Sequence, residues 1–185
     1  MQRGESIMTL TYVTGGIRSG KSEFAESLAF SQAGRVLYVA FGVQTDQEME
    51  KRIDIHKKRR PSEWSVLEEP NELTTVQTVY QDYDVILVDC ISSWLANHCM
   101  WLTEQELKED NKKTSLIEEV ELWLRRIQEN QQHVIVVSNE VGQGGVALSS
   151  LGRFFQDVLG KINQLIAAKA DEAYAVFSGL PLRLK

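Results

Sequence analysis

The sequence lacks three features, and each absence excludes a class of protein. Cys90 and Cys99 are the only cysteines among 185 residues, so the chain does not resemble a secreted domain built on disulfides. No apolar run approaches the ~18 residues that suggest a transmembrane helix, and no apolar leader opens the chain. The net charge of −6 argues against a nucleic acid as the main partner. We therefore expect a cytoplasmic protein without a membrane span.

Strand and helix patterns alternate along the chain, which indicates an α/β fold. Short apolar runs predict strands at residues 10–13, 36–40, 64–68, 85–89, 133–137 and 173–177, with an edge strand at 182–184. Such alternation is typical of a mostly parallel sheet with helices on both faces. We predict a single domain over residues 9–185, preceded at residues 1–8 by an N-terminal extension, expected to be disordered, to which we assign no function.

The segments between these strands carry helical periodicity. It predicts helices at residues 22–30, 46–60, 72–80, 93–100, 114–129 and 151–169. One apolar face is especially clear in the segment 114–129, where it consists of Leu116, Val120, Trp123, Leu124 and Ile127. The polar segment 103–113 is predicted to be an exposed link, and residues 179–181 to form the turn before the edge strand.

The first predicted strand leads directly into a complete G-x-x-x-x-G-K-[ST] phosphate loop. Its residues are Gly15, Gly16, Ile17, Arg18, Ser19, Gly20, Lys21 and Ser22. The glycines let successive N–H groups turn inward around a polyphosphate at the N-terminus of the following helix. Lys21 is expected to bridge the β- and γ-phosphates, Ser22 to hold a Mg²⁺ ion, and Arg18 to add a phosphate contact. The alternative is a glycine-rich turn without a ligand, which the flanking strand and helix disfavour.

Two further polar positions follow predicted strands, where open α/β sheets bind their ligands. Asp89 ends the 85–89 strand and can organise the metal through a bound water or through Ser22. The alternative is an N-cap for the helix that begins near Ser92. The glycine-rich segment 138–145 is able to approach a ligand closely, and the alternative there is a flexible connection.

One of only three histidines, His56, lies within the predicted helix 46–60. It directly precedes four cations, Lys57, Lys58, Arg59 and Arg60. Positive neighbours favour the neutral, nucleophilic imidazole and attract anionic ligands. The alternative is a solvated histidine beside a cluster that complements the helix C-terminus.

The order of these motifs closely resembles the bifunctional adenosylcobinamide kinase/adenosylcobinamide-phosphate guanylyltransferase family of the cobalamin nucleotide-loop pathway. The resemblance spans residues 9–185 and rests on the segments 14–22, 48–53, 56–64, 68–70, 88–97 and 139–142. It implies a RecA-like phosphate-loop (P-loop) NTPase fold and phosphorylation of adenosylcobinamide by ATP or GTP. It further implies transfer of guanylate from GTP, through a histidine, to the new phosphate. A homo-oligomer with a corrinoid and nucleoside triphosphates as its small-molecule partners is expected on the same ground.

The resemblance also assigns roles residue by residue. It implies that Gly15 to Ser22 bind the triphosphate, that His56 is the guanylylated histidine, and that the acidic nucleotide contacts are Glu68 and Asp89. Lys57, Lys58, Arg59 and Arg60 match the nucleotide-contacting run that follows the histidine.

Two segments depart from the family pattern. After Ala40 this chain has Phe41-Gly42 in place of small hydroxyl residues, so any nucleotide contact there is through the backbone. Gly145-Val146-Ala147 stands in place of an isoleucine-valine-proline run. Two rival interpretations remain: a P-loop kinase of another small metabolite without guanylyltransferase activity, and a nucleotide-binding regulatory module without turnover.

Overall fold

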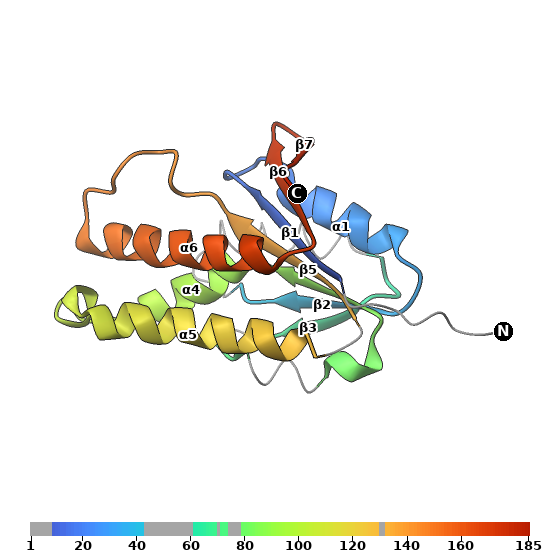
Figure 1. Cartoon of the computed structure of the whole chain (residues 1–185), viewed down its shortest axis with the longest axis horizontal. Coiled ribbons are helices and arrows are strands. Elements are labelled where there is room, and N and C mark those ends of the chain that lie inside the picture. The colour runs from blue at the N-terminus through green and yellow to red at the C-terminus, as the bar shows by residue number, and fades with distance from the viewer. Residues whose placement is uncertain (1–8, 43–60, 70, 74–78, 130–131) are drawn as a thin grey trace.

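A computed structural model describes residues 9–42, 61–69, 71–73, 79–129 and 132–185. These residues build a seven-stranded sheet in the order β3-β2-β4-β5-β1-β6-β7 (Figure 1). The strands are β1 (Thr9–Gly15), β2 (Val36–Ala40), β3 (Ser65–Glu68), β4 (Val85–Asp89), β5 (His133–Asn139), β6 (Glu172–Phe177) and β7 (Leu180–Arg183). All neighbours pair in parallel except β6 and β7, which form an antiparallel hairpin. The carboxyl ends of the strands from β1 to β6 therefore meet at one edge of the sheet.

Helices cover both faces of this sheet. The helix α1 (Lys21–Ser31) packs on one face, and α4 (Ile91–Cys99), α5 (Asp110–Ile127) and α6 (Ser150–Lys169) lie together on the other (Figure 1). Because successive side chains of a strand point to opposite faces, each inner strand supplies both cores. In β2, for example, Leu37 and Val39 join the core under α4, α5 and α6, while Val36 and Tyr38 join the core under α1. Burial on both faces explains why the strands are continuous apolar runs without polar alternation.

The predicted α/β fold is confirmed. The strands predicted at residues 36–40 and 85–89 agree with β2 and β4, and the predicted helix 151–169 agrees with α6 to within a residue. The apolar face predicted for the segment 114–129 is the buried face of α5, residue for residue. The predicted helix 46–60 lies outside the described residues, as do the 1–8 extension and most of the predicted helix 72–80.

Two local predictions were wrong. The segment 103–113 is not a single link, because α5 already begins at Asp110 and a short 3₁₀ turn occupies Glu106–Lys108. Thr103 and Glu106 hold that turn by a reciprocal capping box: Glu106 Oε2 accepts from the Thr103 N–H at 2.8 Å, and Thr103 Oγ1 accepts from the Glu106 N–H at 3.3 Å. The turn before β7 is Ser178-Gly179 rather than residues 179–181, since both residues have a positive φ.

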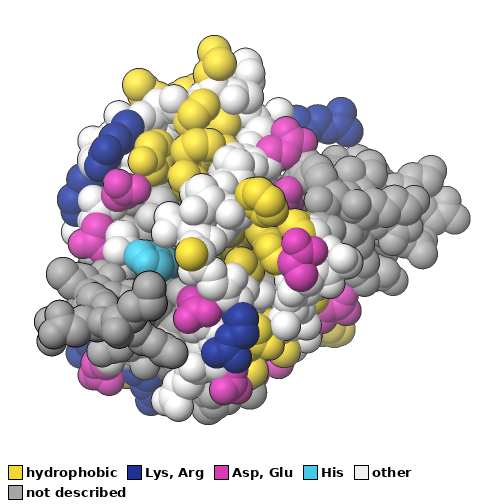
Figure 2. All heavy atoms as spheres, turned by 90° about the vertical axis from the view of Figure 1, so that its right-hand side faces the viewer, with side chains coloured by type: hydrophobic (Ala, Val, Ile, Leu, Met, Phe, Trp, Pro, Cys, Tyr) yellow, Lys and Arg dark blue, Asp and Glu magenta, His cyan; other side chains and the backbone are white. Residues whose placement is uncertain are grey.

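No helix among the described residues is both long and apolar enough to cross a bilayer. Figure 2 shows one face of the molecule, on which hydrophobic side chains gather in the upper part and near the centre, and charged side chains of both signs lie around them. Mixed surfaces of this kind are usual, because a folded chain has too few polar groups to cover its whole exterior.

Candidate active site

The phosphate loop joins β1 to α1 at the carboxyl edge of the sheet. Gly15 and Gly20 are required there for different reasons. A Cβ on Gly15 would lie 2.6 Å from the carbonyl oxygen of Val176 in the neighbouring strand β6. Gly20 has φ +91°, and a Cβ there would lie 3.0 Å from the Cα of Gly179. The loop can therefore follow this path only with glycine at both positions.

The first turn of α1 and the β6–β7 turn fix the rest of the loop. Gly20 is the N-cap of α1 and accepts a hydrogen bond from the Phe24 N–H at 3.0 Å. On the other side, the Gly179 N–H donates to the Ser19 carbonyl at 2.7 Å. Free N–H groups at a helix N-terminus, together with the helix dipole, form an anion-binding concavity. The local geometry is thus that of a phosphate cradle.

Lys21 and Ser22 direct their polar atoms to different partners around this cradle. The Lys21 ammonium folds back over the loop and donates to the Gly16 carbonyl at 3.2 Å. The Ser22 hydroxyl donates to Asp89 Oδ1 at 3.2 Å, although 67 residues separate the two in the sequence. The structure therefore brings Ser22 and Asp89 together, as the sequence prediction required.

Asp89 is held by a second group that the sequence analysis missed. The hydroxyl of Tyr38, which is 1% exposed, donates to Asp89 Oδ2 at 2.7 Å. With Oδ2 engaged by Tyr38, the carboxylate is oriented so that Oδ1 faces Ser22. Asp89 is not a helix cap: α4 begins at Ile91 with Cys90 as its N-cap residue. The capping alternative for Asp89 was therefore wrong. No sequence signal identified Tyr38, because it lies in an apolar run.

The strand order sets the distance between the strand ends that carry the site residues. Asp89 pairs with Val137 of β5 and Gly15 pairs with Asn139 of the same strand, so β5 separates them. Neighbouring strands are about 4.8 Å apart, which places the ends of β1 and β4 about 10 Å from each other. Glu68 ends the edge strand β3 and is exposed, two strands from Asp89 at the same edge. The structure does not bring Glu68 into contact with the phosphate loop.

The predicted nucleophile and its basic run lie outside the described residues: His56, Lys57, Lys58, Arg59 and Arg60. The other two histidines are described, and neither is near the loop. His133 begins β5 opposite Thr9, at the far edge of the sheet, about 20 Å along the strand from Asn139. His98 lies in the last turn of α4, where its Nε2 is 3.1 Å from the Asn71 carbonyl and its ring packs on Trp94.

Cys90, beside Asp89, is not poised to act as a nucleophile. Burial and the negative charge of Asp89 raise the pKa of its thiol, whereas a reactive thiolate needs a lowered pKa. Its sulfur lies 2.9 Å from Ser92 Oγ and 3.1 Å from Ser93 Oγ, in the first turn of α4. We therefore regard Cys90 as a structural residue of this turn.

The glycine-rich segment after β5 is held in place and is not a flexible connection. Glu140 begins it, and its N–H donates to the Gly15 carbonyl at 3.0 Å, so the segment starts beside the phosphate loop. Gln156 of α6 donates from Nε2 to the carbonyls of Val141 and Gly145, at 3.0 and 2.9 Å, and accepts from the Ala147 N–H at 2.9 Å. Sequence reasoning missed Gln156, because an amide on a helix gives no local signal of a loop contact.

Residues 11–184 match the family model described as "Cobinamide kinase / cobinamide phosphate guanyltransferase". The chain belongs to this family. It is 36% identical over 178 residues to the "Bifunctional adenosylcobalamin biosynthesis protein CobU" of Salmonella typhimurium, covering 94% of this chain and 98% of that protein. It is also 36% identical over 174 residues to the protein CobP of the same description from Pseudomonas aeruginosa, covering 94% and 95%. The resemblance stated from the sequence is confirmed.

A solved structure supports the fold independently. The KaiC-like protein PH0186 of Pyrococcus horikoshii superposes with a TM-score of 0.50 at 14% identity, covering 94% of this chain and 80% of that one. At this identity the likeness concerns the fold alone. Together with the mostly parallel sheet, it is consistent with the predicted RecA-like α/β fold.

Proposed function

We propose that the protein phosphorylates adenosylcobinamide with ATP or GTP and then transfers GMP from GTP to the phosphate it has made. Membership of the family supports this pair of reactions. The observation that carries the proposal is the contact between Ser22 and Asp89, with Lys21 on the same phosphate loop. These residues form a site for a nucleoside triphosphate and not merely a glycine-rich turn.

In the kinase reaction the chain supplies placement and positive charge. The N–H groups of the loop bind the β- and γ-phosphates, and Lys21 moves from the Gly16 carbonyl to the phosphate oxygens. Ser22 and Asp89 offer the oxygen ligands that Mg²⁺ prefers, Asp89 through Ser22 or a water molecule. When bound, Mg²⁺ neutralises charge on the phosphoryl group that is transferred. The acceptor hydroxyl attacks the γ-phosphorus and loses its proton to water, the bond from the γ-phosphorus to the β-phosphate oxygen breaks, and the nucleoside diphosphate leaves.

In the guanylyltransferase reaction His56 is proposed as the nucleophile. Its imidazole attacks the α-phosphorus of GTP, an N–P bond forms, and pyrophosphate leaves. The phosphate of adenosylcobinamide phosphate then attacks the same phosphorus and releases His56. The basic residues Lys57, Lys58, Arg59 and Arg60, with Glu68, are proposed to contact the nucleotide.

The described neighbours of this segment are compatible with that role. Pro61, which follows Arg60, lines a groove on α1 together with Glu23, Glu26, Ser27, Phe30 and Trp64. His56 is five residues from Pro61, and an extended chain of that length spans at most about 18 Å. Glu23 is two residues beyond Lys21. The length of the connection therefore allows His56 to approach the start of α1.

Three further features are proposed on the family relationship. The protein is a homo-oligomer, and a neighbouring subunit helps to complete the pocket around His56. Residues 9–185 act as one domain. The enzyme works in the cytoplasm, where its nucleoside triphosphate substrates are found.

The proposal is tested by incubating the protein with α-labelled GTP and Mg²⁺. We expect label on the chain that acid releases and base does not, as a phosphoramidate requires. His56→Asn is expected to abolish this label and guanylyl transfer while most adenosylcobinamide phosphorylation remains. His98→Asn is the matched control, because His98 lies in α4 away from the phosphate loop, and it is expected to label normally. Label that persists in the His56→Asn variant, or that maps to a lysine, would overturn the mechanism.

A further inference from the structure

The loop between β5 and α6, residues 140–149, is held by several hydrogen bonds from side chains of α6. Besides the contacts of Gln156, Arg153 donates from Nη1 to the carbonyls of Ala147 at 3.1 Å and Leu148 at 2.6 Å. Ser149 then caps α6 by accepting from the Gly152 N–H at 3.0 Å. Two side chains of one helix face thus set the path of the loop from residue 141 to residue 148.

This fixed loop turns apolar side chains outward. Val146 is 80% exposed and Leu148 is 99% exposed, although Ala147 between them points back to Gly152. The preceding segment Gly142–Gly145 is exposed too, and a Cβ on Gly144 or Gly145 would meet nothing within 4 Å. The loop therefore offers a small apolar surface next to the exposed residues Gln143 and Gly144. Holding such a surface rigidly in water gives no stability, which points to a binding role.

The position of the loop relates it to the transferred phosphate. It follows β5, which lies between the strand of the phosphate loop and the strand of Asp89, and it begins at the Glu140–Gly15 hydrogen bond. In Figure 1 it projects beyond the end of β5 above the start of α6. An acceptor attacks the γ-phosphorus in line, from the side opposite the leaving group. The bulk of the acceptor must therefore rest on a surface beyond the phosphate loop, at this edge.

We propose that Val146 and Leu148, with the backbone of Gln143 and Gly144, bind the corrin macrocycle of the acceptor. This inference rests on the proposed function and specifies which part of the chain recognises the corrinoid. A corrin is a broad ring with methyl groups at its edge and carboxamide arms. The two apolar side chains match the methyl-bearing edge, and the exposed backbone groups match the amides. Gln156 acts as a positioning residue because it touches the loop and not the substrate.

The test compares acceptor binding with nucleotide chemistry in the same preparation. In the double variant Val146→Ser/Leu148→Ser, we expect the KM for adenosylcobinamide to rise at least ~10-fold, because apolar contact area is lost. The KM for GTP and the formation of the guanylyl adduct, which needs no corrinoid, are expected to stay unchanged. Leu122→Ser, an exposed leucine on α5, is the control and should leave every constant as it is.

Two additional measurements keep the inference open to refutation. Gln156→Ala should raise the KM for adenosylcobinamide in the same direction, whereas Val146→Ile/Leu148→Met should preserve it. If the double serine variant binds the corrinoid as tightly as the wild type, the inference is wrong. Should the wild type fail to phosphorylate adenosylcobinamide, the proposed function is wrong instead. Equilibrium dialysis, following the visible absorbance of adenosylcobinamide, then still decides whether the loop binds it.

Discussion

The two oxygens of Asp89 have separate partners, and this division matters for the proposed metal site. Oδ1 lies beside Ser22, and Oδ2 accepts from Tyr38 in the adjacent strand β2. A carboxylate with only one partner would be free to rotate. The hydrogen bond from Tyr38 therefore reduces the conformational entropy lost when Oδ1 is held toward the proposed metal. Outer groups of this kind commonly tune metal affinity without contacting the metal.

We predict that Tyr38→Phe raises the Mg²⁺ concentration needed for half-maximal kinase activity about threefold to tenfold. The kcat at saturating Mg²⁺ should change little, and the lost hydrogen bond should lower the free energy of unfolding by ~1 kcal/mol. The measurement is a Mg²⁺ titration of the kinase reaction. Tyr83→Phe is the control, since the Tyr83 ring packs near Arg35 at the opposite edge. An unchanged Mg²⁺ requirement in Tyr38→Phe would remove Tyr38 from the proposed site.

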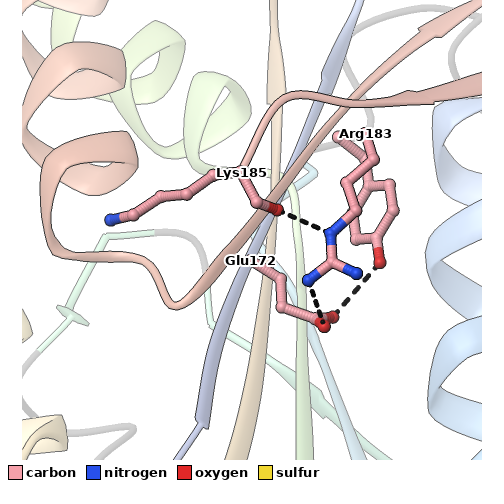
Figure 3. A network of polar contacts seen from close by, with 4 residues as sticks. Glu172, Arg183 and Lys185 are labelled. Carbon is pink, nitrogen blue, oxygen red and sulfur yellow. Dashed lines mark hydrogen bonds and ion pairs between the residues drawn. The ribbon is translucent and has the colours of Figure 1, made fainter.

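At the scale of elements, the β6–β7 hairpin supports the phosphate loop. Its turn consists of Ser178 and Gly179, with φ of +52° and +81°, and it contacts the loop through the Gly179–Ser19 hydrogen bond. The base of the hairpin is tied by Arg183, which donates to Glu172 Oε1 at 3.1 Å and to the Lys185 carbonyl at 2.8 Å (Figure 3). This short edge hairpin therefore helps to fix the shape of the phosphate loop.

Gly179→Ala is predicted to lower the free energy of unfolding by about 1 kcal/mol, because L side chains disfavour the positive φ. It should also raise the KM for nucleotide, since a turn that relaxes away from this φ moves the N–H of residue 179 from the Ser19 carbonyl. Gly160→Ala is the matched control: this glycine lies inside α6, and its Cβ would meet nothing within 4 Å. It should stabilise the protein by ~0.5–1 kcal/mol and leave nucleotide binding alone. Urea unfolding and nucleotide titration check both variants, and equal effects would contradict the role of the hairpin.

Element positions could be predicted where one local pattern dominates. The buried face of α5 follows from its period, and β2 and β4 follow from their apolar runs. The start of α5 was predicted too late, because Asp110 and its polar neighbours were assigned to a link although an acidic first turn favours a helix N-terminus. Thr103 and Glu106 carried a readable capping-box signal that the sequence analysis did not use.

At the scale of the whole molecule, the strand order decides which residues meet. The sequence predicted that Ser22 and Asp89 act together, and the phosphate-loop motif carried that prediction. It could not predict that Tyr38 joins them, since that contact connects strands 51 residues apart in the chain. It also could not predict that Gln156 holds the β5–α6 loop, since an amide on a helix gives no local signal of a loop contact. Hydrophobic patterns identify strands but give no order, because every inner strand carries the same apolar run. The roles of His56 and its basic neighbours stay predictions.

Burial of two tyrosines, Tyr12 in β1 and Tyr80 in the 3₁₀ turn Tyr80–Asp82 before β4, makes the whole fold sensitive to alkali. Burial raises the pKa of Tyr12 to about 12 and raises the pKa of Tyr80 as well. Because these pKa values are higher in the folded than in the unfolded chain, the unfolded chain loses its protons first as pH rises. The stabilisation is complete below about pH 9 and is lost as pH rises toward the folded values.

We therefore predict that the free energy of unfolding falls by about 1.5 kcal/mol between pH 8 and pH 10.5 through these two tyrosines, at roughly 1.4 kcal/mol per pKa unit. Urea unfolding followed by circular dichroism at several pH values measures this fall. Tyr12→Phe removes one of the two groups, so its curve should be shallower than that of the wild type by about half of the predicted fall, on the same linkage. Parallel curves for the two proteins would mean that Tyr12 titrates alike in the folded and unfolded chains, and that its burial in the core does not govern the alkaline limit of the fold.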